Sequence, residues 1–160
     1  MSRFPADSAS GAPVTLLAVH AARRRAGTRG RGKGSDVEAV PTILVVDDDA
    51  DIRDAMCLIL EHNGYRAMAA SNGEEALRVL RAGRPVDLIL LDMMMPVMDG
   101  WGFRTSQPDG PAFVKIPVIV LTGDGRASAK AAAIGAVAYL KKPLDIDEFL
   151  ALVARRCAPT

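Results

Sequence analysis

Polar side chains that could do chemistry follow four short apolar segments of the sequence. The segments and the residues that follow them are 43–46 with Asp47-Asp48-Asp49, 88–91 with Asp92, 118–121 with Thr122, and 137–140 with Lys141-Lys142-Pro143. If the segments are parallel strands of one open sheet, their carboxyl ends lie at one edge, which is where ligands bind in such sheets. The sequence therefore predicts a site that combines carboxylates, a hydroxyl and an ammonium group.

Carboxylates gathered at one edge raise one another's proton affinity unless a cation lies among them. No Cys or His stands beside these acidic residues, and ligation by oxygen alone favours a hard ion such as Mg²⁺, which also binds phosphate oxygens. Phosphoryl transfer at such a site depends mostly on positioning and on neutralisation of charge. In that chemistry Asp92 would be the nucleophile, Lys142 a counter-charge and Thr122 a hydrogen-bond donor to the phosphoryl oxygens.

The elements that must position these residues alternate between strand and helix patterns. The continuous apolar runs at 43–46, 88–91 and 118–121 predict strands that are buried on both faces, as in a parallel sheet. Residues 65–69 and 137–140 are weaker strand candidates. Five strands and five helices in under ~120 residues imply right-handed crossovers and a three-layer α/β fold.

Helix starts and stops are also readable in the sequence. Asn63-Gly64 should end the first helix, and Gly83 and Gly135 should follow two later ones. Capping boxes are expected at Ser71-x-x-Glu74 and Asp145-x-x-Glu148. The stretch 99–107 should form only a short helix, because it contains two glycines and precedes a proline.

The fragments ILVVDDD, DLILLDMMMP, VIVLTG and YLKKP occur in this order, and together they resemble the receiver domain of the response regulators of bacterial two-component systems. The resemblance covers about residues 41–157. It implies a flavodoxin-like receiver fold, which is a doubly wound five-stranded parallel sheet with strand order 2-1-3-4-5. That order is taken from the family and from the known behaviour of this architecture.

The resemblance also implies roles for single residues. Asp92 matches the phosphorylated aspartate, and Asp47 and Asp48 match the acidic pair that holds Mg²⁺, Asp48 directly and Asp47 through water. The backbone carbonyl of Met94 matches a further metal ligand. The side chains of Met94 and Asp124 flank the phosphoryl group in that family.

Thr122 and Tyr139 match the family's switch pair, and Lys142 matches the lysine before a proline, Pro143, whose peptide bond is often cis in the family. The implied function is that of a phosphoacceptor that catalyses its own phosphorylation and dephosphorylation and is not otherwise an enzyme. The phosphoryl donor would be a histidine kinase or a histidine phosphotransfer protein. With no DNA-binding output domain expected in 160 residues, output would pass by contact with a downstream protein, with a homodimer as an open alternative.

Composition suggests two parts. The first forty residues hold seven Arg and Lys against three Asp and Glu and lack sustained periodicity, so we expect a disordered, basic, Arg/Gly-rich extension at 1–40 and a receiver domain at 41–158. Cys57 and Cys157 lie far apart in the sequence, and no export signal or membrane segment is visible, so we expect a cytoplasmic protein without disulfides.

Three alternatives remain open at this point. Asp47-x-Asp49-x-Asp51 after a strand also resembles the opening of a small haloacid-dehalogenase-like phosphohydrolase, in which Asp47 would be the nucleophile. The basic segment 23–33 could bind nucleic acid, which would give an affinity that falls steeply with salt. A degenerate receiver that serves only as a dimerisation scaffold would not need Asp92.

Overall fold

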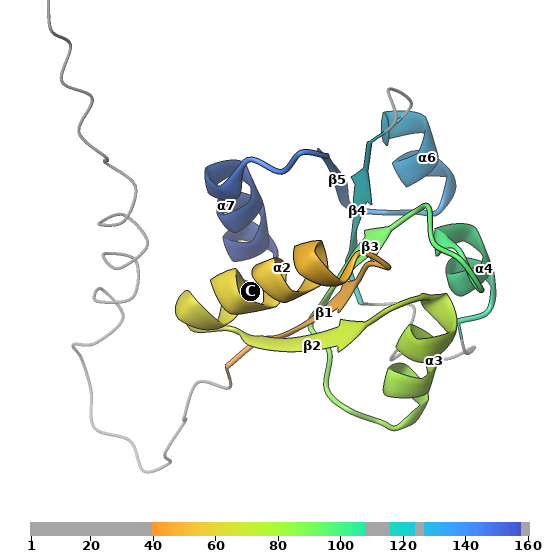
Figure 1. Ribbon diagram of the computed structural model, residues 1–160, viewed down its shortest axis with the longest axis horizontal. Helices are drawn as coiled ribbons and strands as arrows, with labels where there is room; N and C mark the ends of the chain where they lie inside the picture. Colours follow the sequence, from red (N-terminus) through yellow and green to blue (C-terminus); the bar gives the residue numbers. More distant parts are fainter. Residues whose placement is uncertain (1–39, 108–115, 124–126, 158–160) are drawn as a thin grey trace, which may run out of the picture. The chain divides into compact units, whose positions relative to one another are not determined.

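The computed structural model describes residues 40–107, 116–123 and 127–157 (Figure 1). Its centre is a five-stranded sheet of order β2-β1-β3-β4-β5, in which every neighbouring pair is parallel. The strands are β1 Thr42–Val46, β2 Arg66–Ala70, β3 Leu88–Asp92, β4 Val118–Thr122 and β5 Ala138–Lys141. The expected strand order is therefore confirmed. The prediction for residues 1–39 and the one for Asp124 lie outside the described residues.

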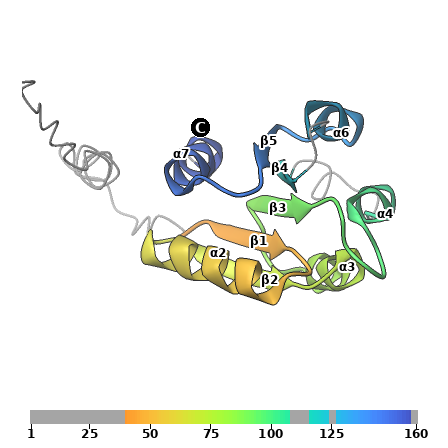
Figure 2. The same ribbon diagram turned by 45° about the horizontal axis from the view of Figure 1, so that its top comes forward.

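Helices cover both faces of the sheet (Figure 2). One face carries α2 Ala50–His62 and α7 Ile146–Cys157, and the other carries α3 Gly73–Arg81, α4 Gly100–Thr105 and α6 Ala127–Ala133. Each face has its own hydrophobic core, one centred on Phe149 of α7 and the other on Phe103 of α4. This is the three-layer arrangement that the alternation of strands and helices predicted.

The three central strands are buried along their whole length, as their continuous apolar runs predicted. Successive side chains point to opposite faces, so Leu44 packs beneath α3 while Ile43 and Val45 pack beneath α2. The two flanking strands each begin one residue later than expected, at Arg66 and Ala138. The polar residues that follow the strands thus share one edge of the sheet.

Most helix ends lie where the sequence placed them. The helix α2 is followed by Asn63 and by Gly64, whose φ is 83°, and Gly83 and Gly135 likewise have positive φ after α3 and α6. The helix α4 spans six residues and is short, as predicted. Asp145 caps α7, since its carboxylate accepts the Glu148 N–H at 2.9 Å.

The capping box predicted for Ser71 and Glu74 is wrong by one residue. The N-cap of α3 is Asn72, whose side chain accepts the Glu75 N–H at 3.0 Å, while the Glu75 carboxylate accepts the N–H and the hydroxyl of Ser71. Gly73, the first residue of α3, donates its N–H to the carbonyl of Met98 at 3.0 Å. This contact with a distant loop favours a helix that begins after Asn72, although Ser71 is an equally good cap by residue type.

None of the helices in the described ranges has the length and apolar character needed to cross a bilayer.

Candidate functional site

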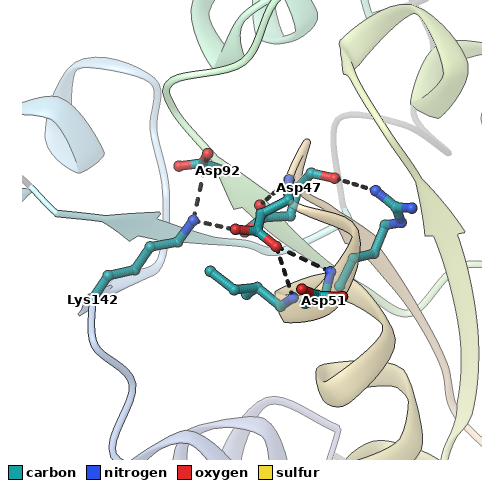
Figure 3. Close-up of polar contacts among 7 residues, drawn as sticks. Asp47, Asp51, Asp92 and Lys142 are labelled. Atoms are coloured by element: carbon teal, nitrogen blue, oxygen red, sulfur yellow. Dashed lines mark hydrogen bonds and ion pairs between the residues drawn. The ribbon is translucent and has the colours of Figure 1, made fainter.

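Asp47 lies directly after β1 and is completely buried. Its backbone N–H donates to the carbonyl of Ala70 at 3.2 Å, which ties it to the end of β2. One carboxylate oxygen accepts the Asp49 N–H at 3.0 Å, and the other accepts the Lys142 ammonium at 2.7 Å (Figure 3). A buried carboxylate needs such partners, because an unpaired charge in the interior is costly.

Asp92 is the last residue of β3 and is 5% exposed, whereas Asp48 follows Asp47 in the loop and is exposed. A carboxylate oxygen from each of Asp47, Asp48 and Asp92 lies within 4.8 Å of the other two. We call these three residues the acidic cluster. The structure thus brings together side chains that the sequence separates by more than forty positions.

Lys142 provides the cation of the site. It follows β5, its N–H donates to the carbonyl of Thr122 at 2.8 Å, and its peptide bond to Pro143 is cis, as the family resemblance implied. Its ammonium lies 2.7 Å from Asp47 and 3.5 Å from Asp92 (Figure 3). The adjacent Lys141 is exposed, and it is Lys142 whose ammonium lies at the carboxylates.

Burial and charge shift the proton affinities in this site. Burial raises the pKa of Asp92, the nearby Lys142 ammonium opposes that rise, and the charge of Asp47 adds to it. The backbone N–H of Met94, which donates to the Asp92 carboxylate, also opposes the rise. Burial disfavours the charge on Lys142, but its hydrogen bond to Asp47 and its attraction to Asp92 outweigh this and raise its pKa. Lys142 therefore stays charged at neutral pH.

The expected switch residues lie on the two strands β4 and β5. Thr122 ends β4 and is 1% exposed, and Leu121 before it pairs in register with Asp92. Tyr139 lies on β5 opposite Val120 and is 46% exposed. Met94 follows Asp92 by two positions, and its side chain is 70% exposed. A thioether is too soft a ligand for Mg²⁺, so any contribution of Met94 to such a metal would come from its backbone carbonyl.

Sequence reasoning missed one contact of the acidic cluster. Arg53, in the first turns of α2, donates from its guanidinium to the backbone carbonyl of Asp47 at 2.9 Å. The only hint in the sequence is its place on the helix that follows the acidic run. No periodicity marks a contact between a side chain and a carbonyl six residues earlier.

The donor chemistry of the cluster fits a hard divalent cation. Three carboxylates meet one ammonium group, and in the part of the chain that the structure describes neither Cys nor His joins them. Oxygen ligands with an excess of negative charge suit Mg²⁺, which needs few protein ligands. The residues are also suited to draw a phosphoryl group, since Lys142 is charged and lies beside a buried carboxylate.

Comparison with known proteins gives concordant results. Residues 43–154 match the family model described as response regulator receiver domain. The response regulator MprA of Mycolicibacterium vanbaalenii is 37% identical over an alignment of 126 residues, and the match covers 73% of this chain and 52% of that protein. An NtrX-like response regulator of Rickettsia bellii is 31% identical over 74% of this chain and 25% of its own length. The chain thus spans about half the length of MprA and a quarter of the NtrX-like protein.

Solved structures resemble the chain over nearly their whole length. The chemotaxis protein CheY4 of Vibrio cholerae has a TM-score of 0.67 and 30% identity, covering 73% of this chain and 98% of its own. The signal receiver domain of a histidine kinase from Syntrophus aciditrophicus has a TM-score of 0.65 and 34% identity, covering 73% of this chain and 89% of its own.

Proposed function

Because the chain belongs to the response regulator receiver family, we propose that it accepts a phosphoryl group on Asp92 in a Mg²⁺-dependent reaction. The observation that carries this proposal is the position of Asp92. Its carboxylate lies within 4.8 Å of two other carboxylates and 3.5 Å from the Lys142 ammonium, at the edge of the sheet where ligands bind.

The reaction exchanges one bond to phosphorus for another. An oxygen of the Asp92 carboxylate attacks the phosphorus, and the bond from phosphorus to a histidine nitrogen of the donor breaks. Lys142 then moves its hydrogen bond from Asp47 toward the new phosphoryl oxygens, and the Thr122 hydroxyl donates to them. When bound, Mg²⁺ supplies positive charge beside the transferring oxygens. Asp48, Asp92 and the carbonyl of Met94 would hold the ion, with Asp47 acting through water.

We propose that the signal leaves through Thr122 and Tyr139. Phosphorylation adds roughly −1.5 to −2 charges, which draws the Thr122 hydroxyl inward and opens space for the half-exposed ring of Tyr139. A change of this kind shifts an existing equilibrium of the face formed by α6, α7 and β5. A partner that binds the shifted face more tightly reads the signal.

The partners belong to the same proposal. The donor is a histidine kinase or a histidine phosphotransfer protein, and output passes by protein contact in the cytoplasm, as in a single-domain regulator. The match to almost the whole of CheY4 supports the single-domain reading, and the longer relatives MprA and NtrX-like offer the multidomain alternative. Sedimentation of the protein with and without phosphorylation tests the further proposal that it forms a homodimer.

Labelling with radioactive acetyl phosphate tests the function. The full chain should take up acid-stable label that requires Mg²⁺ and is released by hydroxylamine, as expected for an acyl phosphate. Asp92→Asn should take up none, whereas Asp51→Asn, which removes an exposed carboxylate from α2, should label like the parent. Undiminished labelling of Asp92→Asn would overturn the proposal.

The phosphohydrolase alternative uses the same site differently. There Asp47 is the nucleophile, so turnover of a phosphomonoester would survive Asp92→Asn and be lost in Asp47→Asn. Against it stands the geometry of Asp47, whose two carboxylate oxygens already accept hydrogen bonds from Asp49 and Lys142.

A further inference from the structure

The contact between Arg53 and Asp47 joins the first helix of the domain to the acidic cluster. We propose that Arg53 is a positioning residue for the metal site. Its guanidinium holds the peptide between Asp47 and Asp48 in the orientation that binding of the divalent cation requires. The inference deepens the proposed function and rests on its assignment of Mg²⁺ to the cluster.

The carbonyl that Arg53 holds belongs to the peptide that joins the two acidic residues. A peptide unit is planar, so fixing the direction of the Asp47 carbonyl also fixes the Asp48 N–H and the bond that leads to the Asp48 Cα. Arg53 donates to this carbonyl at 2.9 Å. The orientation of this backbone group thereby sets where the Asp48 side chain begins.

Asp47 is already held on its other sides. Its N–H donates to Ala70, and its carboxylate accepts from Asp49 and Lys142. Asp48 is exposed and lies between Asp47 and Asp49, whose N–H the Asp47 carboxylate accepts. Without Arg53, the peptide between Asp47 and Asp48 would lose the hydrogen bond that fixes its carbonyl, and the Asp48 carboxylate would be held less firmly at the cluster.

Arg53 is itself well placed to act as a brace. Its backbone N–H donates to the Asp49 carbonyl at 3.0 Å in the first turn of α2, which Asp49 caps by accepting the N–H groups of Asp51 and Ile52. The hydrogen bond from its guanidinium is partly buried and charge-assisted, which makes it stronger than a bond between neutral groups. The side chain of Arg53 thus links the first turn of α2 to the loop that precedes the helix.

The charge of Arg53 also acts on the pKa of Glu75, a residue outside the acidic cluster. The pKa of Glu75 is lowered chiefly by the hydrogen bonds from Ser71, with small contributions from Arg78 and Arg53. The groups that act on the pKa of Asp92 are instead Lys142, Asp47 and Met94. The contact that links Arg53 to the cluster is its hydrogen bond to the backbone carbonyl of Asp47.

Titration of the full chain with Mg²⁺ in a calorimeter tests this inference. Replacing a residue that orients a metal ligand without touching the metal typically lowers metal affinity by about 10–100-fold. Arg53→Met should therefore weaken Mg²⁺ binding by about 10-fold. Arg81→Met is the matched control, since Arg81 is exposed in the last turn of α3, and its Mg²⁺ affinity should equal that of the parent.

The Mg²⁺ dependence of labelling by acetyl phosphate separates positioning from simple loss of stability. In Arg53→Met the Mg²⁺ concentration for half-maximal labelling should rise by the same factor, while the rate at saturating Mg²⁺ should stay close to that of the parent. A role in stability alone would lower the urea midpoint and leave the Mg²⁺ affinity of the folded protein unchanged.

The outcomes are distinct. Equal Mg²⁺ affinity of Arg53→Met and the parent overturns the inference and leaves the proposed function standing, whereas a parent that binds no Mg²⁺ overturns the proposed function. If Arg53→Met does not unfold cooperatively in urea, Arg53→Gln decides by the same titration, since its short neutral side chain also removes the charge-assisted bond.

Discussion

Val97 is the residue whose backbone conformation the sequence explains least, and it gives the sharpest test of the structure. It lies in the loop between β3 and α4, five residues after Asp92, with φ at 68°. That value falls in the left-handed region, which β-branched residues rarely adopt because the side chain crowds the backbone. The Val97 side chain is 79% exposed, so packing does little to offset the strain.

The size of the effect follows from opposing terms. A left-handed conformation costs an L-residue about 1–2 kcal/mol, and glycine avoids this but loses about 0.5–1 kcal/mol more conformational entropy on folding. Val97→Gly should therefore raise the free energy of unfolding by about 0.5–1 kcal/mol. Val97→Asn should raise it by about 1 kcal/mol, since asparagine tolerates the left-handed region without the entropy of glycine.

Urea unfolding followed by circular dichroism measures this change, and the melting temperature should rise by about 2–5 °C. The matched control is Val137→Gly, because Val137 is 39% exposed and does not have positive φ. Its stability should fall, by roughly 0.5–1 kcal/mol. A Val97→Gly variant less stable than the parent would refute the backbone strain inferred for this loop.

Further predictions concern the site and its support. Burial raises the pKa of Asp92 above its ordinary 3.8 despite Lys142, so this group favours folding below pH 3.8 and the benefit is lost as pH rises through the raised pKa. In EDTA, the stability of Asp92→Asn should thus exceed that of the parent by more at pH 7 than at pH 4, and equal differences at both would contradict this. Lys142→Met leaves Asp47 buried without its cation and should cost about 1–3 kcal/mol in urea unfolding, less than for a fully buried pair because the Lys142 side chain is 21% exposed. Gly73→Ala should cost about 1–3 kcal/mol, because its Cβ would lie 2.7 Å from Met98 Cγ and 3.0 Å from the Met98 carbonyl oxygen, and an unchanged urea midpoint would show that the loop yields.

The site could be predicted because its residues stand at the ends of strands. A continuous apolar run predicts a buried parallel strand, and the polar residue after the run then lies at the edge of the sheet formed by the carboxyl ends of the strands. Asp47, Asp92 and Thr122 satisfy this rule, whereas Lys142 is the second polar residue after the weaker run 137–140. The structure brings the carboxylates and the amine together. The resemblance added the strand order and the choice between the two adjacent lysines.

Features that depend on contact between distant segments could not be predicted. Ser71 and Asn72 are both good helix caps, and the hydrogen bond from Gly73 to Met98 decides between them. The contact of Arg53 with a carbonyl likewise has no signature in the order of residues. Local sequence patterns predicted the strands and helices, whereas the exact residue at which α3 begins depends on packing between elements.

The electrostatics of the acidic cluster give the strongest reason to expect a cation there. Three carboxylates share one ammonium, which lies closer to Asp47 at 2.7 Å than to Asp92 at 3.5 Å. Asp92 is therefore buried with incomplete compensation, and its raised pKa records that imbalance. A divalent ion would remove the imbalance and would also leave Lys142 free to meet a phosphoryl oxygen. The ammonium lies nearer to Asp47, the more deeply buried of the two carboxylates, where an unpaired charge would cost most, so the second carboxylate is the one that a bound cation would compensate.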